Sequence, residues 1–186
     1  MKNKIGVIHG RFQGLHLGHM EYLLAGLERS EHLIIGITNN EPTTVKAVDS
    51  VNPSRTLTAS NPFTYYERFC MIKESFVERG VPLSAFDIVP FPLEFPEKIS
   101  NYVPLNATFY ITIYDEWGKK KLLLLQEMGL KTDVMWIRTN ADRLTSSTEV
   151  RDRIFNKKEW KYLVPSAVYN FVIANKLDER IRYGKK

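Results

Sequence analysis

The stretch that decides the fold is IGVIHGRFQGLHLGHMEYLLAGL, residues 5–27. The apolar run Ile5–His9 predicts a strand, and the apolar spacing of residues 19–29 predicts a helix. Between them, His16 and His19 flank a glycine where the strand hands over to the helix. A helix N-terminus offers unpaired N–H groups and a partial positive charge, histidine adds donors, and glycine lets a ligand approach closely. The stretch therefore predicts chemistry on a nucleotide phosphate.

Strand and helix patterns alternate along the rest of the chain. Further strands are expected at residues 32–38, 85–91, 108–114 and 134–137, and further helices at 64–79, 115–128, from 146 or 147, and at 164–176. The expected helix N-caps are Thr64, Asp115 and Ser146 or Ser147. Such βαβ alternation builds a parallel sheet with a ligand at the carboxyl ends of its strands, near the switch point. We therefore expect an α/β fold: a single Rossmann-like, doubly wound parallel five-stranded sheet with a C-terminal helical segment at about residues 146–178.

Size and composition fit one domain spanning residues 1–186. The chain is 44% hydrophobic and 25% charged, which is ordinary for a globular protein. No apolar run approaches the roughly 20 residues that span a bilayer, and the N-terminus lacks the features of a secretory signal. The single cysteine, Cys70, cannot form an internal disulfide and is expected in the core. These features favour the cytoplasm and no membrane partner.

The net charge of +5 leaves two interpretations open, a solvated basic surface or an anionic ligand. Basic residues concentrate at positions 119–121, at 157–158 and in the tail 180–186, which resemble exposed helix faces and a frayed end. No arginine-rich run with interleaved aromatic residues is present, so no nucleic-acid partner is expected.

A second polar cluster, Thr145–Arg151, has the sequence TSSTEVR. It fits a plain helix N-cap with a charged first turn. It also fits a phosphate clamp, because hydroxyls and backbone N–H groups bind single oxygens while Arg151 binds as a fork. A metal site is not expected at His16 and His19, because no third ligand stands at a recognisable spacing.

These two segments resemble the HxGH and SSTxxR signatures of the HxGH nucleotidyltransferase superfamily. The matching residues are His16-Leu17-Gly18-His19 and Ser146-Ser147-Thr148-Glu149-Val150-Arg151. Within it, residues 10–13, 61–68 and 160–182 resemble the archaeal-type nicotinamide mononucleotide adenylyltransferases, which are similar to cytidylyltransferases. The resemblance extends over most of the chain.

The resemblance implies a reaction in which an acceptor phosphate or phosphonate oxygen attacks the α-phosphorus of a nucleoside triphosphate, and pyrophosphate leaves. It implies that His16 and His19 contact the triphosphate, that Arg11 and Arg151 hold its outer phosphates, and that Mg²⁺ bridges the phosphates. The further nucleotide-binding candidates are Gly10, Phe12, Gln13, Gly18, Ser146, Ser147, Thr148 and Lys46.

Several positions depart from the family pattern. Gly14 stands where the family usually has proline, and Lys46 lies in an unusually long loop, residues 39–62. Lys46 could reach phosphates, but a solvated loop lysine fits equally well. No tryptophan is found where one would stack on a nicotinamide ring, so Tyr102 or Phe95 would have to serve there. Trp117 fits a packing residue and is also a candidate for stacking, so the acceptor-binding candidates are Tyr102 and Trp117.

Three functions follow. The leading one is adenylyl transfer from ATP to nicotinamide or nicotinate mononucleotide. The second is CTP-dependent cytidylyl transfer to a small phosphomonoester or phosphonate. The third is a non-catalytic nucleotide-binding regulatory module. In the first two, the partners are the NTP and a small phosphorylated acceptor, and a homo-oligomer is an open alternative.

Overall fold

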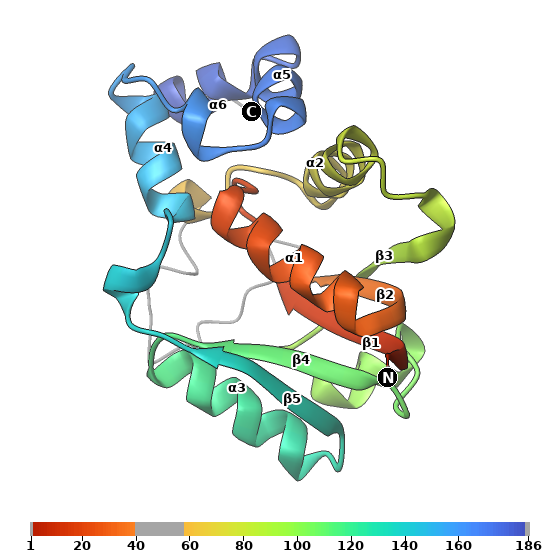
Figure 1. Ribbon diagram of the computed structural model, residues 1–186. Coiled ribbons are helices and arrows are strands. Elements are labelled where there is room, and N and C mark those ends of the chain that lie inside the picture. Colours follow the sequence, from red (N-terminus) through yellow and green to blue (C-terminus); the bar gives the residue numbers. More distant parts are fainter. Residues whose placement is uncertain (1, 40–57, 185–186) are drawn as a thin grey trace. The chain divides into compact units, whose positions relative to one another are not determined.

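The computed structural model describes residues 2–39 and 58–184, and Lys46 lies outside them (Figure 1). The strands are β1 (Asn3–Gly10), β2 (Ser30–Ile37), β3 (Phe86–Pro90), β4 (Thr108–Ile113) and β5 (Lys131–Ile137). The helices are α1 (Leu17–Arg29), α2 (Tyr65–Glu78), α3 (Glu116–Glu127), α4 (Ser147–Phe155), α5 (Ser166–Ala174) and α6 (Leu177–Tyr183). Among these helices, none is long and apolar enough to cross a membrane.

The chain divides into two compact units. Unit 1 comprises Met1–Gly10, Glu21–Thr38 and Pro82–Leu144, and unit 2 comprises Arg11–Met20, Asn39–Val81 and Thr145–Lys186. Unit 1 therefore holds the sheet, whereas unit 2 holds both polar motifs predicted from the sequence. Helix α1 begins in unit 2 and continues in unit 1.

The sheet of unit 1 is parallel throughout, with the strand order β3-β2-β1-β4-β5. Strands β2 and β3 lie on one side of β1, and β4 and β5 lie on its other side. The order thus reverses between β1 and β4, which makes this pair the topological switch point. The predicted Rossmann-like five-stranded sheet is confirmed.

Helices pack on both faces of this sheet. Neighbouring residues of a strand point to opposite faces, so Val7 and Ile8 of β1 face different helices. On one face, Gly26 of α1 lies so close to β1 that an added Cβ would be 2.3 Å from Ile8 Cδ1. On the other face, Leu125 of α3 joins the apolar core cluster that contains Val7 and Phe109. Helix α3 lies along β4 and β5 (Figure 1).

The three predicted N-caps are confirmed, whereas the helices expected from residues 19 and 164 begin at Leu17 and Ser166. At each of the three N-caps, the side chain accepts a hydrogen bond from the backbone N–H three residues later in the chain. Thr64 accepts from Glu67, Asp115 accepts from Gly118, and Ser146 accepts from Glu149. The helix expected over residues 164–176 ends earlier. Lys176 adopts a left-handed φ of 53°, and the chain starts α6 after it.

Helix α2 buries one stripe of side chains. Its buried residues are Arg68, Met71, Ile72, Ser75 and Phe76, which recur at intervals of three and four. Cys70 lies beside this stripe and is only half-buried, so the expectation of a core position is wrong.

The C-terminal tail is not frayed as far as Tyr183, which corrects the expectation from its charges. In unit 2, both terminal nitrogens of Arg180 donate to the carboxylate of Glu67, at 2.7 and 2.8 Å. The same guanidinium donates to the Pro62 carbonyl at 3.0 Å. A bidentate, charge-assisted pair of this kind holds geometry well, and it attaches α6 to the start of α2.

Candidate functional site

The loop that leaves β1 begins unit 2 and is fixed by Gln13. This side chain is buried, and its amide both donates to the Phe63 carbonyl and accepts from the Phe63 N–H, each at 3.0 Å. The flanking residues Phe12 and Gly14 have φ values of 49° and 86°. Gln13 therefore lies between two residues with left-handed backbone, and its amide fixes this loop to the backbone of Phe63.

Arg68 of α2 braces the same loop from below the surface. Its guanidinium is fully buried and donates to the carbonyls of Arg11 and Asn39, each at 2.8 Å, and to that of Thr64 at 3.1 Å. Burial lowers the pKa of Arg68 to about 10, so the group stays protonated at neutral pH. One cation therefore joins three separate segments of unit 2.

The two histidines of the first motif form an ordered pair at the start of α1. The His19 N–H donates to Nδ1 of His16 at 3.3 Å, and the Met20 N–H donates to the His16 carbonyl at 3.0 Å. Because Nδ1 accepts, neutral His16 carries its proton on Nε2 and can donate from that atom. The two imidazole rings stack with centroids 3.7 Å apart, and Phe12 meets His19 edge-on.

Gly18 has a packing reason to lie between the histidines. A Cβ at this position would stand 3.2 Å from the His16 ring and 3.7 Å from the Thr145 carbonyl oxygen. A larger residue would therefore press on the ring that caps the helix. The short distance to Thr145 also shows that the two polar motifs lie next to each other at Gly18.

The second motif closes onto the first within unit 2. Ser147 donates to the Gly14 carbonyl at 3.2 Å, and Nη1 of Arg151 donates to the Gln13 carbonyl at 3.0 Å. Nη2 of Arg151 donates to the Thr148 hydroxyl at 3.3 Å. Segments more than a hundred residues apart thus converge on one loop, at the N-termini of α1 and α4.

Arg151 is largely buried, and burial lowers its pKa from the ordinary arginine value. Its two described bonds are to protein atoms, so it already acts as a brace for the loop. Arg11 is less buried, and its Nη1 lies 3.5 Å from Oδ1 of Asn61. That these two arginines hold outer phosphates stays a prediction.

Other predicted site residues belong to unit 1. Gly10 ends β1, Trp117 lies in the first turn of α3, and Tyr102 is 40% exposed after a short 3-10 segment. Their roles toward nucleotide and acceptor stay predictions. Across residues 2–39 and 58–184, no group of three His, Cys, Asp or Glu side chains is arranged to hold a metal ion.

Two residues of this region were missed by the sequence analysis in its search for functional side chains. Arg68 lies within the matching range 61–68, and a lone arginine in an apolar helical stripe is a signal of a buried polar contact. His9 is a polar residue at the end of an apolar strand, a pattern that by itself assigns it no role. It is 3% exposed, and neither ring nitrogen has a hydrogen-bond partner in the part of the chain that the structure describes. Such burial costs about 1–3 kcal/mol.

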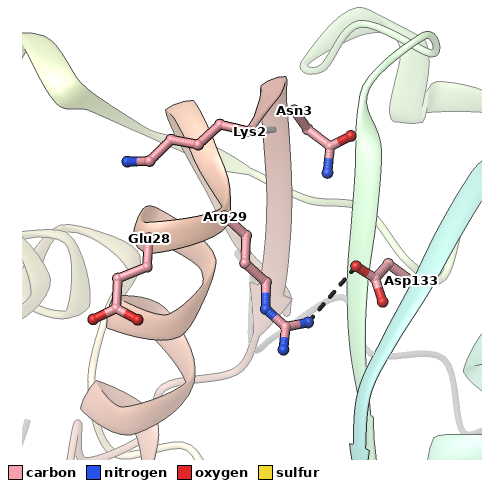
Figure 2. A pocket seen from close by; sticks show the side chains of 5 residues that line it. All are labelled: Lys2, Asn3, Glu28, Arg29 and Asp133. Carbon is pink, nitrogen blue, oxygen red and sulfur yellow. Dashed lines mark ion pairs between the residues drawn. The ribbon is translucent and has the colours of Figure 1, made fainter.

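A polar hollow in unit 1 is a poor candidate for binding a triphosphate. It is lined by Lys2, Asn3, Glu28, Arg29 and Asp133, and Arg29 pairs with Asp133 at 3.7 Å (Figure 2). Two basic and two acidic side chains leave no excess charge for a polyanion. The hollow also lies at the amino ends of β1 and β5, whereas ligands of open parallel sheets bind at the carboxyl ends.

Comparison with known proteins adds to this geometry. A family model described as cytidylyltransferase-like matches residues 7–153. A phosphonoformate cytidylyltransferase from Streptomyces viridochromogenes is 48% identical over 177 residues, which cover 95% of each chain. A nicotinamide-nucleotide adenylyltransferase from Saccharolobus solfataricus is 32% identical, over 95% of this chain and 94% of the relative. A bifunctional NMN adenylyltransferase/ADP ribose pyrophosphatase from Francisella tularensis, solved with AMP and a manganese ion, has a similar fold. Its TM-score is 0.65 at 17% identity, and the match covers 97% of this chain and 52% of that one.

The bracing by Arg68 predicts a large cost on its removal. Arg68→Met leaves the carbonyls of Arg11 and Asn39 without this donor, so we expect the free energy of unfolding to fall by on the order of 3 kcal/mol. Urea denaturation measures this loss. Arg79→Met, at the exposed end of the same helix, is the control and should change stability by less than about 0.5 kcal/mol. Equal stability of the two variants would contradict the bracing role.

The loop geometry also predicts the effect of proline at position 14. Gly14 has a φ of 86°, whereas proline is fixed near −65°, so this chain cannot hold the residue that the family usually has here without rebuilding the loop. We expect Gly14→Pro to lower stability by about 3 kcal/mol or more and Gly14→Ala by about 1–2 kcal/mol. Thermal unfolding of both variants checks the order, and a proline variant as stable as the wild type would refute the left-handed turn.

Proposed function

The chain belongs to the cytidylyltransferase-like family and is a nucleotidyltransferase, and from this premise we propose that it transfers a cytidylyl group from CTP to a small phosphonate or phosphomonoester. The observation that carries the proposal is the match along nearly the full length of the Streptomyces phosphonoformate cytidylyltransferase. The convergence of Ser147 and Arg151 on the loop before His16 supports it, because a triphosphate needs donors from several directions.

The proposed reaction is a single displacement at phosphorus. An oxygen of the acceptor forms a bond to the α-phosphorus of CTP, the bond from that phosphorus to the bridging oxygen of the β-phosphate breaks, and pyrophosphate leaves. The acceptor oxygen is already ionised near neutral pH, so no general base is required. Catalysis then consists of positioning and of stabilising the charge that develops on the phosphoryl oxygens.

We assign the charge stabilisation to the histidine pair. Because Nδ1 of His16 accepts from the His19 N–H, neutral His16 carries its proton on Nε2, the atom that would donate to a phosphoryl oxygen. His19 stands in the first turn of α1, where the helix dipole also favours an anion. Stacking of the two rings limits their rotation, so little order has to be gained when the nucleotide binds.

The remaining polar residues would hold the triphosphate tail. Arg11 and Arg151 would contact the outer phosphates, and Ser146, Ser147 and Thr148 would add donors at the start of α4. Gly10, Phe12, Gln13 and Gly18 would shape the loop around the phosphates. Mg²⁺ would enter with the nucleotide and would neutralise part of its phosphate charge. The Francisella structure with AMP and manganese is consistent with a divalent ion.

A second candidate is adenylyl transfer to nicotinamide or nicotinate mononucleotide, which the match to the Saccharolobus enzyme favours. Tyr102 or Trp117 would then stack on the pyridine ring. In either case we propose that residues 1–186 act as one nucleotidyltransferase domain. A cytoplasmic location and a homo-oligomer stay predictions.

The choice of nucleotide is tested by pyrophosphate release. We expect turnover with CTP, Mg²⁺ and phosphonoformate, and a kcat/KM at least about tenfold lower when ATP replaces CTP. ATP with nicotinamide mononucleotide forms the second arm of the same assay. Turnover in that arm alone would replace the cytidylyltransferase by the adenylyltransferase, and nucleotide binding without pyrophosphate release from any acceptor would support the regulatory module.

The role of His19 is tested by His19→Ala. Removing a donor aimed at developing charge costs about 3 kcal/mol, so kcat should fall on the order of a hundredfold. The backbone N–H of residue 19 is retained, so the helix cap and the fold should persist by circular dichroism. His32→Ala on β2, where the imidazole pairs with Asp87, is the matched control and should turn over normally. Normal turnover by His19→Ala would end this assignment.

A further inference from the structure

His9 lies at the switch point of the sheet in unit 1. β1 pairs with β4 only at Gly6 with Thr108 and at Val7 with Phe109, although both strands continue toward their carboxyl ends. The two strands therefore separate beyond Val7, and His9 comes two residues later. In open parallel sheets this is where ligands enter.

The His9 ring is held firmly in its orientation. It stacks on Phe91 with ring centroids 4.7 Å apart and an angle of 7° between the planes. Phe91 in turn packs over Gly36, the residue that pairs with His9 in β2, where an added Cβ would lie 2.7 Å from Phe91. An apolar side chain would pack on Phe91 as well as an imidazole does. It would not leave two polar nitrogens unpartnered among the described residues.

One positive charge, that of Lys121, lies near His9. Lys121 of α3, which is half-buried, acts electrostatically on the imidazole, so its positive charge lies near the ring. Burial first and this charge second hold the pKa of His9 well below its usual range. The imidazole is therefore neutral at pH 7 and has one N–H to donate.

We propose that His9 and Lys121 recognise an oxyanion of the acceptor, a carboxylate or a phosphonate, and that His9 is a specificity-determining residue of the enzyme. This inference rests on the proposed nucleotidyl transfer and names part of its acceptor site. The imidazole N–H donates to one anionic oxygen, and the Lys121 ammonium balances the charge. Since His9 is only 3% exposed, binding requires neighbouring side chains to move.

The test is direct binding of three probes to the full chain by calorimetry: phosphonoformate, methylphosphonate and oxalate. For His9→Leu we expect the Kd of phosphonoformate to rise at least about tenfold and the Kd of CTP to stay within about twofold. Methylphosphonate and oxalate reveal which of the two anionic groups contacts the imidazole. His9→Gln, which keeps an N–H donor, should recover part of the affinity, and His32→Leu is the matched histidine control.

Stability gives a second, independent readout. Because an apolar side chain removes two unpartnered nitrogens, the melting temperature of unliganded His9→Leu should equal or exceed that of the wild type. The proposal is overturned if His9→Leu and Lys121→Met bind all three anions as the wild type does, or if the wild type binds none of them. Pyrophosphate release with CTP and another acceptor would then still uphold the transferase. If instead the protein releases no pyrophosphate, calorimetry still measures the anion affinities, so the two proposals can fail separately.

Discussion

Gln13 is the residue on which the arrangement of the candidate site depends. Its side-chain amide pairs with the backbone of Phe63, and its carbonyl accepts from Arg151. One residue therefore connects the loop after β1 to the segment before α2 and to the helix that carries the second motif. All three bonds are buried, so water does not compete for them. A group that lost its partner would stay buried without a hydrogen bond, which raises the free-energy cost of breaking any of them.

Two features allow Gln13 to act in this way. Gly14 has a left-handed φ that proline cannot adopt, and the Gln13 carbonyl and side chain next to it bond to different partners. Arg68 then ties the adjoining Arg11 carbonyl to Asn39 and Thr64. The phosphate-binding chemistry proposed for the histidines is thus supported by buried groups that do not themselves need to touch the nucleotide.

The fold and the two polar motifs could be predicted from the sequence because both depend on local patterns. Apolar runs in β2 and β4, and caps such as Thr64 and Asp115, specify their elements within a few residues. The resemblance to the nucleotidyltransferases is confirmed by the family match as well.

The buried polar contacts could not be predicted in this way. Two partners of Arg68, Arg11 and Asn39, lie 57 and 29 residues before it. The fork between Arg180 and Glu67 joins residues 113 positions apart. The left-handed Lys176, which divides the last helix in two, has no local signal in a lysine. His9 was missed because its significance lies in what surrounds it, and a one-dimensional pattern does not record surroundings.

The two histidines differ in a way that bears on genetics. The side chain of His16 supplies the acceptor that caps α1, whereas His19 contributes to that cap only its main-chain N–H, which every residue except proline provides. Alleles altered at codon 16 would therefore be depleted from a complementation library through loss of folded protein as well as loss of chemistry. Depletion at codon 19, proline apart, would report less on the helix cap and more on chemistry, which makes it the cleaner gauge of selection for the reaction.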